Sequence, residues 1–543
     1  MLSVFCRPAT FAAWLLVAFT AVVLTQQSAA AAALPDAPKT FDTTYAAPGG
    51  ATLHVSAGAD LQAALDRAQP GDTLVLEAGA TFTGPFTLPN KTTGSGWIYV
   101  VSSNLASLPS PGQRVGPQHA ANMARIVPRP YGNALSSALT TVDGSHHFRF
   151  VGIEFASVAG PQLYTLIAIG NQDASAATLA HHIVFDRCYV HGVPGAASQR
   201  GIAMDGAYVA VVDSYISDFQ EVDTDTQALW AHNTTGPLQM RNNYIEAAGE
   251  NVLFGGADSR APELVPADIE ITNNHFYKPL ALIATQFTVK NLLEFKSARR
   301  VLVTGNTFEN NPQKSQQGFA IVITPRNQGG TAPWSATTDI ALMRNTLINV
   351  GSGFNLLGHD LLPTQLTERI LIRDNVVGVT GLNGADGRAF QFLAGGSDYT
   401  VDHNTIIYPA TFPPSSDLSM AQSTPKVSNL VFTNNLSTPN HWGFAGSGVG
   451  MGTPALNANF SDWTFSRNVM VDAPADAYPS GNFFPSGVAA VRFANFAAGN
   501  YGLAADSPYK GAGTDGTDIG ANGASVVAVN SIVPDPPTNV VVR

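Results

Sequence analysis

The stretch "RVLVTGNTFENN" (residues 300–311) decides the fold, because its pattern recurs along the chain. Alternating apolar residues predict a strand, a polar turn follows at Gly305-Asn306, and a second short strand carries Phe308. The same pattern is found in residues 146–157, 181–192, 207–218, 237–248, 268–279, 339–350, 369–380, 398–409, 429–440 and 462–473. Such recurrence indicates a repeat architecture rather than a single globular core.

The turn of each repeat holds a small polar residue or an asparagine. The positions are Cys188, Ser214, Asn243, Asn274, Asn306, Asn345, Asn375, Asn404, Asn435 and Asn468. Asparagine tolerates the left-handed backbone of a tight bend, and stacked asparagines can bond to one another as a ladder. Their spacing of roughly 30 residues, with no long helix between them, predicts an all-β solenoid: a parallel β-helix whose coils share one core.

The two ends of the repeat region carry closing segments. Residues 58–79 predict a short amphipathic helix, with Leu61, Ala64 and Leu65 on one face, which caps the open first coil. Residues 501–522 are rich in turn residues and read as the closing segment, and residues 526–543 read as a linker or the start of an incomplete β module.

Residues 1–33 have the pattern of a secretory signal peptide. Arg7 precedes the apolar run "FAAWLLVAFTAVVL" (11–24), and small residues follow near Ala30. The alternative is a membrane anchor, but the run is short for a span. We therefore expect a secreted or periplasmic protein.

Composition narrows the possible partners. Charged residues make up 12% of the chain and the formal net charge is −11, which argues against a nucleic-acid partner. Cys188 is the only cysteine after the signal, so neither an intramolecular disulfide nor a cysteine metal site is expected. No later stretch is apolar enough to predict a membrane span, and a monomer is expected.

Three motifs make the chain resemble a known group. "PGDTLVLEAGATFTGPFTL" (70–88), the asparagine ladder and "SPYKGAGTDGTDIGA" (507–521) resemble secreted bacterial right-handed parallel β-helix proteins of the pectate-lyase-like superfamily, also called the pectin lyase fold. The resemblance spans residues 50–525. It implies a right-handed coil that binds, and often cleaves, an acidic or neutral polysaccharide along one face.

Charge is unevenly distributed along the solenoid. Ten acidic and two basic residues lie between Asp218 and Glu270, whereas eight basic and three acidic residues lie between Lys278 and Arg344. Because successive coils stack, an acidic band is expected beside a basic one.

The stretch "NLLEFKSARR" (291–300) carries the main catalytic hypothesis. Strand alternation points Leu293 and Phe295 inward, so Glu294 and Lys296 share the outer face, and Arg326 follows one coil later. Carboxylates beside a pair of cations suit β-elimination of a uronic-acid glycoside, which needs a base, a neutraliser for the sugar carboxylate and a proton donor. The alternative is a surface ion pair of little energetic worth.

The order Lys296-Ser297 and then Arg326 is similar to that of chondroitinase-B-like lyases. That resemblance assigns Lys296 and Arg326, with Glu294, to catalysis, although Phe295 replaces an asparagine of the family pattern and "TPRNQ" (324–328) replaces Leu-Arg-His-Gly. Burial and a neighbouring cation such as Arg299 would lower the pKa of a lysine base. The further candidates are, for substrate binding, Arg299, Arg300, Glu250 and Asn251 and, for Ca²⁺, Asp223, Asp225 and Asp258.

The leading hypothesis is a polysaccharide lyase, and two alternatives stay open. Asp223 and Asp225 share a strand face and offer the paired carboxylates of a glycoside hydrolase. A non-catalytic carbohydrate-binding or adhesive solenoid would use the same charged bands for binding alone.

Overall fold

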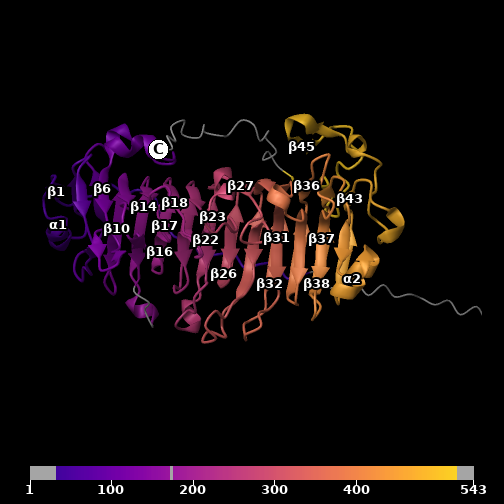
Figure 1. Cartoon of the computed structure of the whole chain (residues 1–543), viewed down its shortest axis with the longest axis horizontal. Helices are drawn as coiled ribbons and strands as arrows, with labels where there is room; N and C mark the ends of the chain where they lie inside the picture. The colour runs from indigo at the N-terminus through magenta and orange to yellow at the C-terminus, as the bar shows by residue number, and fades with distance from the viewer. Residues whose placement is uncertain (1–31, 171–174, 523–543) are drawn as a thin grey trace, which may run out of the picture.

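Short strands joined by turns wind the described chain, residues 32–170 and 175–522 of a computed structural model, into a right-handed parallel β-helix. Successive coils follow one another in chain order along the long axis (Figure 1). The predicted fold class is therefore confirmed. The predicted signal peptide and C-terminal tail lie almost entirely outside the described residues.

Sheet A holds 14 strands, and every neighbouring pair in it is parallel. Its inward residues stack from coil to coil, as Ile269, Val301 and Ile340 do. The strands are β1 (Thr52–Val55), β2 (Thr73–Leu76), β5 (Ile98–Ser102), β10 (His146–Val151), β14 (His181–Asp186), β17 (Ala207–Val212), β20 (Leu238–Arg241), β23 (Ala267–Thr272), β26 (Ala298–Thr304), β29 (Thr337–Met343), β32 (Glu368–Arg373), β35 (Ser397–Asp402), β38 (Ser428–Thr433) and β42 (Trp463–Ser466).

Sheet B holds 13 parallel strands. Aromatic residues stack on its inner side, with 4.4 Å between the ring centroids of Phe276 and Phe308. The strands are β3 (Thr81–Thr83), β6 (Ala124–Val127), β11 (Ile153–Ala156), β15 (Tyr189–His191), β18 (Tyr215–Phe219), β21 (Tyr244–Ala247), β24 (His275–Tyr277), β27 (Thr307–Asn311), β30 (Thr346–Val350), β33 (Val376–Val379), β36 (Thr405–Ile407), β39 (Leu436–Ser437) and β43 (Val469–Met470).

Sheet C also holds 13 strands, of which the last is antiparallel to its neighbour. This sheet carries the candidate active site on its outer face. The strands are β4 (Phe86–Leu88), β9 (Leu139–Thr141), β13 (Ile167–Ile169), β16 (Arg200–Met204), β19 (Gln227–Ala231), β22 (Glu250–Phe254), β25 (Leu293–Phe295), β28 (Phe319–Ile323), β31 (Ser352–Leu357), β34 (Arg388–Leu393), β37 (Asp417–Gln422), β40 (Phe444–Gly446) and β41 (Gly450–Met451).

Two small sheets lie outside the coils. One is formed by β7 (Pro130–Tyr131), β8 (Ala134–Leu135) and β12 (Gln162–Leu163), and the other by β44 (Phe493–Asn495) and β45 (Asn500–Leu503).

The predicted asparagine ladder is present between sheets A and B. The Nδ2 of Asn274 donates to Oδ1 of Asn306 at 3.0 Å, and Asn306 donates in turn to Asn345 at 2.9 Å. Ser214 fills the same slot earlier in the chain and accepts from the backbone N–H of Cys188. The ladder satisfies buried turn amides that water cannot reach.

The bend itself is made by a different residue than the sequence suggests. Positive φ values occur at the residue before each ladder position, as at Asn273 (56°), Gly305 (69°) and His403 (52°), and not at the ladder asparagine. The ladder residue is needed for its side-chain amide, while its predecessor takes the left-handed conformation.

The N-terminal end is closed as predicted. Helix α1 (Leu61–Arg67) buries Leu61, Ala64 and Leu65 against the core, and Asp60 caps it by accepting from the N–H of Ala63. A second helix, α2 (Thr453–Asn459), buries Leu456 near the opposite end.

Residues 33–46, here called the N-terminal strap, run along the outer face of sheet A. The N–H groups of Ala33, Asp36 and Lys39 donate to carboxylates of β35, β29 and β23 in turn. Further along, the carbonyl of Ala46 accepts from Tyr99 of β5. The strap thus crosses most coils of the solenoid. No helix in the described part of the chain is both long and apolar enough to cross a membrane.

Candidate active site

The register of sheet C aligns polar side chains on its outer face. Arg200, Gln227 and Glu250 occupy equivalent positions of β16, β19 and β22, and Trp230 and Glu294 align through Leu253 in the same way. The inner face between them is filled by residues such as Leu229. We call the polar group on this face the sheet C cluster; its members are Arg200, Asp225, Gln227, Glu250, Lys290, Asn291, Glu294 and Lys296.

A continuous chain of contacts links four coils of the cluster. Nε of Arg200 donates to Oε1 of Gln227 at 2.9 Å, and Nε2 of Gln227 donates to Oε2 of the fully buried Glu250 at 2.8 Å. The other oxygen of Glu250 lies 3.6 Å from Nζ of Lys290, which also forms an ion pair with Asp225. The buried carboxylate of Glu250 is thus balanced by a cation.

Glu294 and Lys296 lie together on this face, as the alternation of "LLEFKS" predicts. Nζ of Lys296 is 3.7 Å from Oε1 of Glu294, and Asn291 donates to Oε2 at 2.7 Å. Burial raises the pKa of Glu294 to about 7, with Lys296 opposing the shift and the charge of Glu250 adding to it. A carboxyl with this pKa can give or take a proton at neutral pH.

Gly255 and Gly256 bring the next coil close to this pair. A β-carbon on Gly255 would lie 2.8 Å from the backbone N of Ser297 and 2.9 Å from Cβ of Lys296. The two glycines, with φ of 91° and 76°, therefore allow close packing beneath the Lys296 side chain.

Arg326 neighbours Lys296 through the backbone, but its side chain turns elsewhere. The N–H of Arg326 donates to the carbonyl of Lys296 at 2.8 Å, whereas its guanidinium forms an ion pair with Asp360 of the following coil. The Arg326 side chain is 37% exposed, so it is accessible from solvent.

The predicted substrate-binding residues separate into three places. Arg299 and Arg300 belong to β26 of sheet A, where Arg300 makes a bidentate pair with Asp268 at 2.7 and 2.9 Å and Arg299 donates to the carbonyl of Pro262. Only Glu250 belongs to the sheet C cluster. Asn251 is buried and donates to the carbonyls of Ile245 and Tyr277.

Asn251 also forms part of a cage around Lys278. Nζ of this fully buried lysine donates to Oδ1 of Asn251 at 2.9 Å and to the carbonyls of Ala247, Ala248 and Gly249 at 2.5–3.0 Å. Burial lowers the pKa of Lys278 to about 7, against the opposing charges of Glu250 and Glu246. An ammonium group here occupies an oxygen-lined internal position behind the cluster.

The three predicted calcium ligands are not brought together. Asp225 precedes β19 and pairs with Lys290, while Asp258 follows β22 and accepts from the N–H groups of Gly329 and Thr331. Because β19 and β22 are neighbouring parallel strands, a residue before one and a residue after the other lie at opposite strand ends. Among the described residues, Asp223 does not converge with either carboxylate. The donors therefore do not fit one Ca²⁺ ion, and no chemical step is derived through calcium.

Sequence reasoning missed Arg200, Gln227, Lys290 and Asn291 as members of the site. Arg200, Gln227 and Glu250 are the first residues of successive sheet C strands, so an alignment of these strands would have placed Arg200 and Gln227 beside Glu250. The sequence alignment followed the asparagine turn instead, which lies between the other two sheets.

Comparisons with known proteins place the fold. No family model matches this chain. No curated protein sequence matches it either. Among solved structures, a PL6 family alginate lyase, AlyGC, matches with a TM-score of 0.50 and 13% identity, over 90% of this chain and 59% of that one. The chain thus spans less than two thirds of that lyase.

Two other solved structures have lower scores. A mannuronic acid specific polysaccharide family 6 lyase from human gut microbiota has a TM-score of 0.47 and 10% identity, over 80% of this chain and 92% of that one. The catalytic unit of a GH87 alpha-1,3-glucanase from Streptomyces thermodiastaticus has a TM-score of 0.45 and 13% identity, over 84% and 71%. The likeness to AlyGC, at 13% identity, is one of fold alone, and the activity has to be argued from the site.

Proposed function

We propose that this protein is a secreted polysaccharide lyase that cleaves a uronic-acid-containing polymer by β-elimination on the outer face of sheet C. The observation that carries the proposal is the pairing of two buried carboxylates, Glu250 and Glu294, with two lysines, Lys290 and Lys296, on neighbouring coils. A charged glycan needs such cations for binding, and β-elimination needs groups that exchange protons near neutral pH.

The reaction breaks the C5–H and C4–O bonds of the sugar and forms a C4=C5 double bond. In this proposal the reactive pair holds its proton on Glu294, whose pKa is about 7, and leaves Lys296 as a free amine. Lys296 then takes the C5 proton and becomes an ammonium group, while Glu294 gives its proton to the leaving oxygen and becomes a carboxylate. Arg326, whose N–H already bonds to Lys296, offers its exposed side to the sugar carboxylate.

A panel of alginate, pectate and glycosaminoglycans tests this function. A lyase generates unsaturated products that absorb in the ultraviolet, and the Lys296→Ala variant is expected to lose about 100-fold or more in rate, as for loss of a general base. Lys426→Ala is the matched control, because Lys426 is exposed and donates only to a backbone carbonyl on a distant coil. Equal rates in the wild type and Lys296→Ala would remove Lys296 from the chemistry.

A glycoside hydrolase is the second candidate, favoured by the same two buried carboxylates. The charge of Glu250 helps to keep Glu294 protonated, which is how a general acid and an ionised partner are set apart in such enzymes. A hydrolase releases reducing ends without ultraviolet absorbance, and it loses activity in both Glu250→Gln and Glu294→Gln. If the panel yields neither product but the protein sediments with insoluble polysaccharide, the binding solenoid replaces both enzymes.

A further inference from the structure

Two His-His pairs lie side by side on the outer face of sheet A, on a different sheet from the sheet C cluster. His146 and His147 begin β10, His181 and His182 begin β14, and the register places His146 beside His181. The rings stack from coil to coil, with centroids 5.0 Å apart for His146 and His181 and 4.5 Å apart for His147 and His182.

The backbone turns both imidazoles of each pair toward each other. Successive side chains of a strand normally point to opposite faces, but His147 and His182 have φ values of 58° and 56°. The left-handed conformation breaks the alternation, and the two Nδ1 atoms come within 2.9 Å in the first pair and 2.8 Å in the second. In each pair one Nδ1 donates its proton to the other.

The spacing of these nitrogens suits metal coordination. Two imidazole nitrogens bound at about 2.0–2.1 Å to one ion, at a right angle, lie about 2.9 Å apart. Ligand atoms of His147, His181 and His182 all lie within 4.8 Å of one another, and trans ligands at that bond length would be about 4.2 Å apart.

The surroundings hold the rings in place and keep the site apart from other donors. Trp97 packs against His147 at 5.2 Å between centroids, and Tyr208 stacks on His182 at 4.3 Å. Within the described residues, no other group of three histidine, cysteine, aspartate or glutamate side chains converges in this way. Burial, reinforced by the neighbouring imidazoles, lowers the pKa of His147 and His182 to about 4, so both rings are neutral ligands at neutral pH.

We propose that His147, His181 and His182 form a binding site for one divalent transition-metal ion of the copper, nickel and zinc class, with His146 adjacent as a further donor. Imidazole nitrogen is a favoured ligand for these ions, and the near right-angle bite of each pair favours the tetragonal geometry of Cu²⁺. The site is independent of the proposed lyase activity, because it lies on a different sheet.

Calorimetric titration of the metal-free chain with Cu²⁺ tests the proposal. We expect one ion per chain in the wild type and at least a tenfold weaker affinity in His182→Gln and in the double variant H147Q/H182Q. His441→Gln is the matched control, since this exposed histidine lies next to Trp442 near the other end of the molecule, and its affinity should equal that of the wild type. Circular dichroism of the metal-free variants verifies that they fold.

Fluorescence gives a second readout that does not need a histidine variant. Bound Cu²⁺ should quench Trp97, so the quenching that saturates at one equivalent should be lost in Trp97→Phe while the calorimetric affinity remains. Electron paramagnetic resonance of the Cu²⁺ complex should report coupling to at least three nitrogens. Absence of saturable binding, or equal affinity in wild type and H147Q/H182Q, would overturn the site.

Discussion

At the scale of single residues, buried charges in this molecule are matched to oxygen or nitrogen partners one by one. Lys278 is surrounded by four oxygens, and Glu250 by an amide and an ammonium group. Glu294 is less completely compensated, because its lysine partner is 3.7 Å away and the charge of Glu250 lies near. Asp417 is a second such group, since within the described residues it is buried without a hydrogen-bond partner and burial raises its pKa to about 8. A buried group that is incompletely compensated shifts its pKa rather than remain charged, and such groups concentrate at functional sites.

The raised pKa of Glu294 should therefore make the stability of the folded chain depend on pH. Its pKa is about 7 in the folded chain and near 4.5 when exposed, so the folded state holds the extra proton between these values. Its contribution to stability is present below about pH 4.5 and is lost as the pH rises through 7, by up to about 3 kcal/mol. We expect Glu294→Gln to unfold at a higher denaturant concentration than wild type at pH 8 and at a nearly equal one at pH 4, below the pKa of the exposed carboxyl. Parallel pH profiles for the two proteins would show that Glu294 does not titrate this way.

At the scale of elements, the N-terminal strap is about as long as the part of sheet A that it crosses, and its N–H groups bond to carboxylates of that sheet. Between its contacts with β35 and β5 it crosses nine strand spacings of about 4.8 Å, or about 43 Å. The 13 residue steps from Ala33 to Ala46 span about 43 Å when extended at about 3.3 Å each. The strap is thus nearly straight, and its N–H groups bond to Asp398, Asp339 and Asp268, which lie on every second strand of sheet A.

Removing the strap should weaken the whole stack. A chain beginning at residue 47 loses three N–H bonds to carboxylates and the contact of Phe41 with Tyr208, so we expect a loss of about 2–5 kcal/mol relative to a chain beginning at residue 32. Thermal unfolding measures the difference. Lys39→Ala is the control, because its backbone N–H is kept and its midpoint should change little. Equal midpoints for the two chain lengths would mean that the strap contributes nothing.

The sequence predicts the elements whose residue pattern repeats at a regular interval along the chain. Alternation and the recurring asparagine predict the strands, the ladder and the inward Leu293 and Phe295, because neighbouring coils impose the same demand at each turn. The strap has no repeat, and its partners are more than 190 residues away in sequence for Lys39 and Thr43. In sheet C, Ala228 and Leu229 both face the core, and this break in alternation hid the outward Gln227. Long-range contacts and local bulges do not repeat along the chain, so an analysis based on repeating patterns does not detect them.

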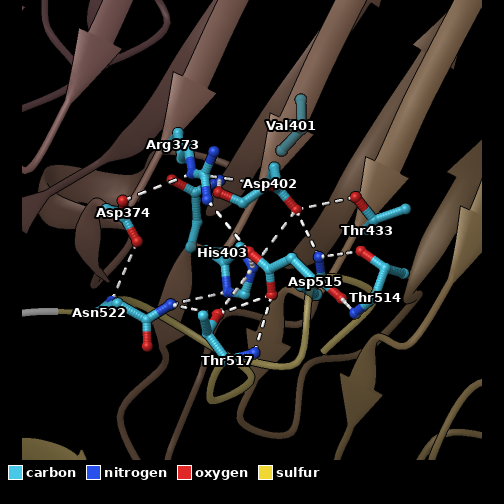
Figure 2. Close-up of polar contacts among 12 residues, drawn as sticks. Arg373, Asp374, Val401, Asp402, His403, Thr433, Thr514, Asp515, Thr517 and Asn522 are labelled. Carbon is cyan, nitrogen blue, oxygen red and sulfur yellow. Dashed lines mark hydrogen bonds and ion pairs between the residues drawn. The ribbon is translucent and has the colours of Figure 1, made fainter. Parts of the chain in front are cut away.

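At the scale of the whole molecule, the acidic and basic bands neutralise each other across coils, as the pairs Asp225–Lys290 and Asp268–Arg300 show. The C-terminal clamp, residues 511–522, extends this pairing by folding back onto the turns between sheets A and B. Figure 2 shows Asp515 between Arg373 and His403, at 3.4 Å from each, and Asn522 donating to His403 at 2.9 Å. The clamp thereby ties three coils together from outside.

Loss of the clamp should destabilise only the coils that it contacts. Ile519 is 2% exposed and packs with Leu436 and Val469, so its removal costs about 2–3 kcal/mol, while the half-exposed ion pairs of Asp515 add little. Because each coil of a solenoid contacts mainly its neighbours, a chain ending at residue 510 should lose amide protection in β32, β35, β38 and β42 and keep it in β10, β14 and β17. The measurement is amide hydrogen exchange of this shortened chain, compared strand by strand with that of a chain ending at residue 522. Uniform loss of protection along the axis would instead mean that the stack unfolds as one unit, and the strap on sheet A would then be the element that couples its two ends.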